Sequence, residues 1–237
     1  MDKKYFDIIE EEYRSIKKDF QERNNKEVAK EISRELPSIF SEVFSFLVDS
    51  FGGKLRLDGK TPLVFHSIFL TKLLYECGIM DEDNLLIGAL HDVLEDTKIS
   101  EDELLNKKFM KGKTGILSSL KILKENVLLS REPNGKTLPP RYREHISRMI
   151  GAPKEVVNVE ILDRFSDLMD LEYITELSEE EKILRLKSKM IKVRSFVENI
   201  THNRKDYNEN CFWLFKYKAK QIEEKYGLII KAELLLR

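Results

Sequence analysis

Four side chains within the run HDVLED, at positions 91–96, can bind a cation or move a proton. The run follows an apolar stretch, and the spacing predicts one helix from about Asp83 through Asp96. In such a helix His91 and Glu95, and likewise Asp92 and Asp96, lie four residues apart and share a side. Crowded carboxylates beside a buried helix need a compensating charge. A neutral imidazole with a carboxylate suits Mn, Fe, Zn or Mg, and a solvated acidic helix end is the alternative.

Two further residues in apolar segments can complete a metal site. His66 lies in the first turn of a helix expected from Leu63 to Glu76, although a lone histidine is more often structural than a ligand. Asp163 lies in an apolar run after Pro153, where a carboxylate is poorly placed unless it is paired. Its neighbour Arg164 is expected on a different face of that helix. Metal ligation would explain the position of Asp163.

The order His…His-Asp…Asp resembles the HD-domain phosphohydrolases. The fuller pattern resembles the hydrolase domain of the RelA/SpoT and MESH1-type (p)ppGpp hydrolases: HDVLEDT, with Asp-Gly-x-x-Pro…His before it and Leu-Asp-Arg after it. The resemblance extends from Gly52 to Leu171. It departs from the family pattern Lys-Leu-Ala-Asp-Arg-Leu-His-Asn at Glu160, Leu162, Ser166 and Asp167, and Ser67 replaces a proline.

The resemblance implies an all-α HD-domain helical bundle and a metal-dependent reaction that removes pyrophosphate from the ribose 3′ position of (p)ppGpp, the nucleotide of the stringent response. It implies Mn²⁺, or another divalent cation, as the cofactor. The implied metal ligands are His66, His91, Asp92 and Asp163. The implied catalytic residues, acting on water, are Glu95 and Asp96. The implied substrate contacts are Arg56, Lys60, Tyr142, Asp167 and Arg164.

Alternatives stay open for individual residues and for the function. Arg164 can equally be a structural brace, Tyr142 a packing residue, and His145 an ordinary, partly exposed side chain. The substrate can be another nucleotide, which the changes around Asp167 favour. A nucleotide-binding or regulatory module without turnover is a further alternative, and the complete set of ligands with both Glu95 and Asp96 argues against it.

Composition limits the partners of this chain of 237 residues. It carries 41 Lys and Arg against 42 Asp and Glu, a net charge of −1, so no basic field attracts nucleic acid. Cys77 and Cys211 stand in separate apolar contexts and predict two buried thiols. No signal sequence or bilayer-length apolar run is present, so we expect no membrane association and a cytoplasmic protein. The expected partner is a small nucleotide, and homo-oligomer formation stays open.

The helices are expected to form a single domain over 1–237, with a core at about 37–200 and terminal helical extensions at 1–36 and 201–237. Capping boxes at Ser100–Glu103 and Ser178–Glu181 predict two helix starts. Lys54 and the basic segment 106–115 are expected to be solvated. A loop is expected at 130–140, where Arg131, Lys136 and Arg141 make it cationic.

Overall fold

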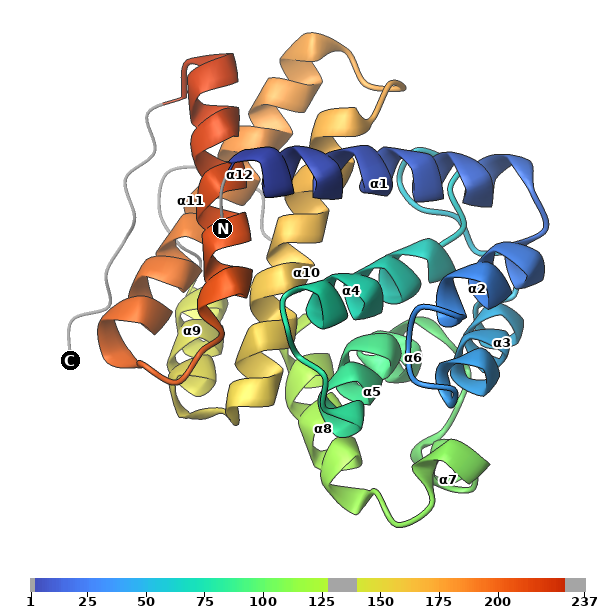
Figure 1. Cartoon of the computed structure of the whole chain (residues 1–237). Helices are drawn as coiled ribbons and strands as arrows, with labels where there is room; N and C mark the ends of the chain where they lie inside the picture. Colours follow the sequence, from blue (N-terminus) through green and yellow to red (C-terminus); the bar gives the residue numbers. More distant parts are fainter. Residues whose placement is uncertain (1–2, 128–139, 229–237) are drawn as a thin grey trace. The chain divides into compact units, whose positions relative to one another are not determined.

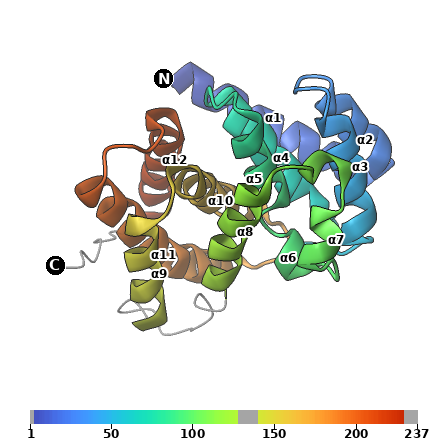
Figure 2. The same ribbon diagram turned by 90° about the horizontal axis from the view of Figure 1, so that it is seen from below.

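The computed structural model describes residues 3–127 and 140–228, and the regular elements of these ranges are helices, as predicted (Figures 1 and 2). An isolated bridge between Leu55 and Pro62 is the sole β pairing there. The chain forms two compact units, Met1–Lys124 and Glu125–Arg237. The expected single domain, with its core and terminal extensions, stays a prediction.

The first unit carries the two histidines of the predicted metal site. Tyr13 on the first helix packs edge-on against Phe65 and Phe69, with ring centroids 5.4 and 5.1 Å away, so the amphipathic N-terminal segment covers the helix that bears His66. The elements of this unit are α1 (Lys3–Glu22), α2 (Asn25–Ser33), α3 (Phe40–Phe51), α4 (Val64–Glu76), α5 (Glu82–Leu90), α6 (Val93–Asp96), α7 (Glu101–Leu105), the 3₁₀ turn η1 (Lys108–Met110) and α8 (Thr114–Val127), whose last residues pass into the second unit.

Helices α4 and α5 lie side by side in both views, and a glycine permits their close approach (Figures 1 and 2). A Cβ atom on Gly88 would clash with the side chain of Leu74, because the two helices leave no space there. Nearly every side chain of α4 is buried, including His66. The interface therefore brings the start of α4 towards the end of α5.

The loop between α3 and α4 is organised by Asp58. This carboxylate accepts hydrogen bonds from the amides of Lys60 and Thr61, at 3.0 and 2.8 Å, and from the Thr61 hydroxyl at 2.5 Å. Lys17 of α1 adds an ion pair at 3.1 Å. Gly59 has a φ of 67°, a conformation that favours glycine. The Asp-Gly sequence therefore builds a fixed turn just before α4.

The second unit is built around α10. The helix packs against α11 and α12, while α9 packs against α11. The elements are α9 (Pro140–Gly151), α10 (Lys154–Tyr173), α11 (Glu179–Asn203) and α12 (Glu209–Tyr226). Arg204, at the end of α11, donates to the carbonyl of Met149 at 3.1 Å and to that of Ala152, which fixes the end of α9.

The predicted helix boundaries hold in most places and fail in two. Both predicted capping boxes are present, at Ser100 and Ser178. The helix expected from Asp83 through Asp96 is interrupted after Leu90. The segment 106–115 is also not a solvated loop, because Phe109 and Met110 are buried and Phe109 packs on Phe46.

Other predictions concern the thiols, the membrane and a loop. Cys77 and Cys211 are both buried and free, as predicted. Among the described residues no helix is long and apolar enough to cross a membrane. The expected loop at 130–140 falls almost wholly outside the described residues.

Candidate metal centre

Three predicted ligands converge in the first unit. His66, His91 and Asp92 each offer one ligand atom, and these atoms lie within 4.8 Å of one another. Asp92 Oδ2 is 3.1 Å from His91 Nε2 and 3.8 Å from His66 Nε2. Both histidines are buried, whereas the Asp92 side chain is 20% exposed. The cluster therefore combines two buried imidazole rings with a partly exposed carboxylate.

The backbone sets the tautomer of His91. Its Nδ1 lies 2.8 Å from the carbonyl oxygen of Gly88, and since a carbonyl only accepts, this nitrogen carries the proton and donates. The Nε2 atom of the neutral ring is then a lone-pair donor pointing at the cluster. The same carbonyl would receive the amide of Asp92 in an uninterrupted helix, and α5 ends at Leu90, just before His91.

This donor set fits a divalent cation. Two imidazole nitrogens and one carboxylate match the ligands preferred by Mn²⁺, Fe²⁺ and Zn²⁺, and the backbone hydrogen bond to His91 is the support that ligating histidines usually have. A second group, formed by Glu12, Glu35 and Glu76, differs. There the buried ammonium of Lys72 contacts all three carboxylates and supplies the compensating charge.

Glu95 and Asp96 lie on the short helix that follows the metal ligands. Both side chains are partly buried, and the Asp92 carbonyl accepts the amides of Glu95 at 3.1 Å and of Asp96 at 2.7 Å. Burial raises the pKa of Asp96 and the nearby charge of Asp92 raises it further, while Lys54, His66 and His91 oppose the rise. The hydrogen bond from the Asp96 amide to the Asp92 carbonyl shows the expected four-residue helical spacing of these two residues. His91 and Glu95, in contrast, do not lie on one continuous helix.

Lys54 is a site residue that sequence reasoning missed. Its side chain is exposed, as expected, and its ammonium donates to the backbone carbonyl of Asp96. The sequence feature that could have indicated this contact is the position of Lys54 directly after the turn at Gly52-Gly53. The Leu63 amide donates to the Lys54 carbonyl at 2.7 Å, and this hydrogen bond holds the loop against the start of α4.

The two predicted cations of the loop lie on either side of the Asp58 turn. Arg56 is partly buried and its amide donates to the carbonyl of Thr61 at 2.8 Å, while Lys60 is exposed. Their loop belongs to the same unit as the histidine cluster. Contact of Arg56 and Lys60 with a substrate stays a prediction.

The remaining predicted ligand, Asp163, belongs to α10 in the second unit. Its Oδ2 lies 3.6 Å from Nη1 of Arg164, so the long arginine side chain reaches this carboxylate although the two adjacent residues start on different faces of the helix. Arg164 also contacts Glu160, and Asp167 at 3.4 Å, and Asp167 pairs with Lys189. The long arginine side chain folds back along its own helix because this places its buried guanidinium among three carboxylates.

Two ring-bearing side chains of α9 are buried, and for His145 this differs from the prediction. His145, expected to be partly exposed, is 1% exposed; it stacks on Phe196 and its Nε2 lies 3.1 Å from Oε1 of Glu160. Tyr142 is 2% exposed, and burial raises the pKa of its hydroxyl well above the usual range. Arg164 counteracts part of this rise. The geometry of Tyr142 in this unit corresponds to packing, and its contact with a substrate stays a prediction.

These features define an all-α protein with a cluster of two histidines and one aspartate that could hold a metal ion. A solved structure of a metazoan ortholog of SpoT, which hydrolyses ppGpp and plays a role in starvation responses, is similar to the chain. The TM-score is 0.58 at 22% sequence identity, and the match covers 81% of this chain and 98% of that one. No protein-family model and no curated protein sequence matches the chain. The fold expected from the resemblance is thus confirmed.

Proposed function

We propose that the chain is a divalent-metal-dependent hydrolase that releases pyrophosphate from the ribose 3′ position of (p)ppGpp and leaves GDP or GTP. The observation that carries the proposal is the cluster of His66, His91 and Asp92, with ligand atoms within 4.8 Å of one another. Support comes from the similar fold of a ppGpp hydrolase. The proposed ion is Mn²⁺, the proposed partner is the small nucleotide, and the proposed location is the cytoplasm.

His66, His91 and Asp92 would hold the ion, and the sequence resemblance assigns Asp163 as a fourth ligand. A bound divalent ion would polarise a phosphoryl oxygen and lower the pKa of water. The hydrogen bond to the Gly88 carbonyl keeps a proton on Nδ1 of His91, which leaves Nε2 to bind the ion. The loop from Lys54 to Lys60 would place up to three cations near phosphate charge.

The proposed role of Glu95 or Asp96 is to take a proton from water. The water oxygen forms a bond to the phosphorus attached to the ribose 3′ oxygen, and the bond between that phosphorus and the 3′ oxygen breaks. The 3′ oxygen accepts a proton and leaves as a hydroxyl, so water is consumed and pyrophosphate is released. General acid–base assistance of this kind is worth about 10²–10⁴-fold in rate.

A different nucleotide substrate is the second candidate, and the second unit supplies the observation that favours it. Tyr142 is buried, and Arg164 is surrounded by Glu160, Asp163 and Asp167. Both residues were expected to contact the substrate of the family. A chain in which they serve packing and bracing would recognise its nucleotide through other groups.

The deciding experiment incubates the protein and Mn²⁺ with ppGpp and, separately, with a panel of nucleotides that includes dNTPs. Chromatography should show GDP and pyrophosphate formed from ppGpp in equal amounts. Consumption of another nucleotide while ppGpp stays intact would select the second candidate. Binding of a nucleotide without turnover of any compound would make the chain a binding module.

A further inference from the structure

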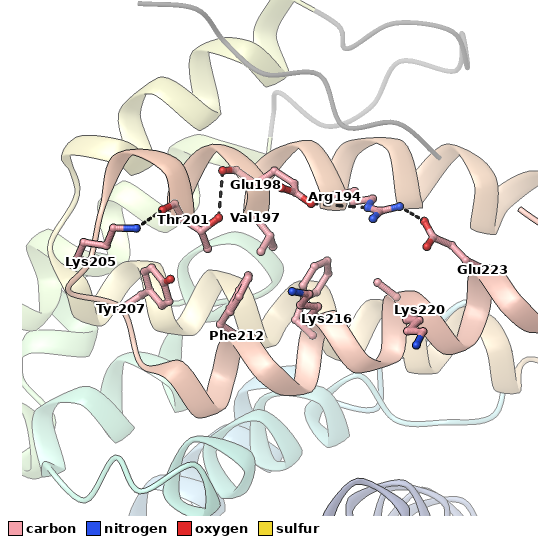
Figure 3. A pocket seen from close by; sticks show the side chains of 12 residues that line it. Arg194, Val197, Glu198, Thr201, Lys205, Tyr207, Phe212, Lys216, Lys220 and Glu223 are labelled. Atoms are coloured by element: carbon pink, nitrogen blue, oxygen red, sulfur yellow. Dashed lines mark hydrogen bonds and ion pairs between the residues drawn. The ribbon is translucent and has the colours of Figure 1, made fainter. Parts of the chain in front are cut away.

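A pocket of about 420 Å³ lies between α11 and α12 in the second unit (Figure 3). Pockets of roughly 300–1,000 Å³ are the usual size for small-molecule sites. The residues that line it lie between Arg194 and Glu223 in the sequence, and none of the residues predicted for the metal-dependent reaction is among them. Any role of this pocket is therefore independent of the proposed function.

The inner part of the pocket is apolar and aromatic. Val197, Phe215 and Ala219 line it and are all buried. Tyr207 and Phe212 line the same space, with ring centroids 5.4 Å apart and planes inclined by 57°. These two side chains can contact a planar ring of a ligand. Removal of that ring from water and its stacking on an aromatic side chain would both favour binding.

The charged residues of the pocket have an excess of cations. Four cations, Arg194, Lys205, Lys216 and Lys220, line it against two carboxylates, Glu198 and Glu223. Both carboxylates are engaged by Arg194, whose ion pair with Glu223 joins the two helices across one end of the space (Figure 3). The uncompensated charge of the lining is therefore positive.

The lysines follow the aromatic residue along one helix. Phe212, Lys216 and Lys220 are spaced by four residues on α12, so successive side chains lie about 6 Å apart along its axis. Lys216 Nζ is 6.0 Å from the Phe212 ring centroid, and within the described part of the chain it has no carboxylate partner. Lys220 has an exposed pair with Glu224, at 3.6 Å, and such a pair holds the lysine weakly.

We infer that this pocket binds a planar aromatic ring joined to phosphate, the chemistry of a nucleoside diphosphate. The ring occupies the space beside Tyr207 and Phe212, and the phosphates lie against Lys216 and Lys220. The positive charge of the lining favours an anionic ligand, and the aromatic pair favours a ligand that contains a ring. The distance of about 6 Å along the helix axis between Lys216 and Lys220 suits two neighbouring phosphates.

The test uses the full chain with the substitution His91→Ala, kept in EDTA, so that the metal cluster takes no part. ADP and GDP are titrated while the methyl resonances of Val197 and Thr201, both of which line the pocket, are followed by NMR. Both resonances should shift in a saturable manner. Adenosine, which lacks phosphate, and pyrophosphate, which lacks a ring, should each bind more weakly than ADP.

The variant Lys216→Gln with Lys220→Gln removes two charges from exposed positions without changing the apolar lining. It should weaken ADP binding by about tenfold or more, because the two positive charges that face the phosphates are lost. Lys187→Gln is the matched control, because Lys187 is exposed on α11 and does not line the pocket. It should bind ADP like the parent.

Three results would overturn the inference. The first is no saturable shift of Val197 and Thr201 with either nucleotide. The second is equal binding of pyrophosphate and ADP, or unchanged ADP binding in the double variant. The third is a shift that follows protein concentration in the absence of nucleotide, which would make a second copy of the chain the occupant of the pocket.

Discussion

The Nδ1 atom of His91 lies 2.8 Å from the carbonyl oxygen of Gly88, one turn earlier on α5. Gly88 thus serves the candidate centre twice. Its carbonyl orients a predicted ligand, and its missing side chain lets α5 lie against Leu74 of α4. The position of His91 relative to His66 therefore depends on the packing of these two helices.

Replacing Gly88 by alanine should lower the free energy of unfolding by about 1–3 kcal/mol, because the added methyl group overpacks the interface of α4 and α5. It should also weaken metal binding, since the helices that carry the two histidines are forced apart. Urea denaturation and titration with Mn²⁺ measure the two effects. Gly151→Ala is the control: a Cβ there meets no atom within 4 Å, and the variant should unfold like the parent. Equal stability of both variants would refute the packing role.

Purified protein should carry about one divalent ion per chain, and His91→Ala or Asp163→Ala should abolish it. The first change removes a nitrogen from the cluster, and the second tests the ligand assigned by the sequence resemblance. Elemental analysis after gel filtration gives the stoichiometry. Glu12→Gln, in the carboxylate group around Lys72, is a control that should retain the ion. Full occupancy in both ligand variants would exclude the assignment.

Glu95→Gln and Asp96→Asn separate an enzyme from a binding module. Each keeps the size of the side chain and removes a base, so turnover should fall by about 10²–10⁴-fold in at least one variant. Metal content should change little in either, because the proposal places these carboxylates on water and not on the ion. Loss of the ion in both variants would make them ligands, and unchanged turnover in both would remove them from the mechanism.

Asp58 should make stability depend on acid pH. Burial by itself raises the pKa of Asp58, but the hydrogen bonds from Thr61 and Lys60 and the contact with Lys17 outweigh it, so the pKa lies well below its usual range. Because the folded pKa is below the unfolded value of about 3.9, the unfolded chain binds the proton first. The contribution is complete above pH 5 and declines as the pH falls below about 4.

The variant Asp58→Asn should cost about 1–3 kcal/mol of unfolding free energy at pH 7, since charge-assisted hydrogen bonds are lost. The difference from the parent should shrink as the pH is lowered from 5 to 3. Chemical denaturation across this range measures it. Asp49→Asn is a control, because Asp49 has an exposed pair with Lys26 and should show little pH-dependent difference. A difference for Asp58→Asn that does not vary with pH would contradict the linkage.

The sequence alone determined the elements that depend on local patterns. The helical periodicity, the capping boxes at Ser100 and Ser178 and the Asp-Gly turn are set by neighbouring residues, and each is present in the structure. The HDVLEDT motif identified His91 and Asp92 as candidates for the same reason, since adjacent residues keep their relation in almost any fold.

Only the tertiary structure decided how residues distant in sequence meet. The proximity of His66 to Asp92 depends on the packing of α4 against α5. His145 of α9 is buried by contacts with Glu160 of α10 and Phe196 of α11. Arg164 is enclosed by carboxylates of its own helix, α10. Lys54 reaches Asp96 because a turn folds its loop over the start of α4. The hydrophobic periodicity of a sequence specifies which face of a helix is buried. Which polar groups then meet within the buried region depends on how the side chains of neighbouring helices pack, and this is decided only in the folded structure.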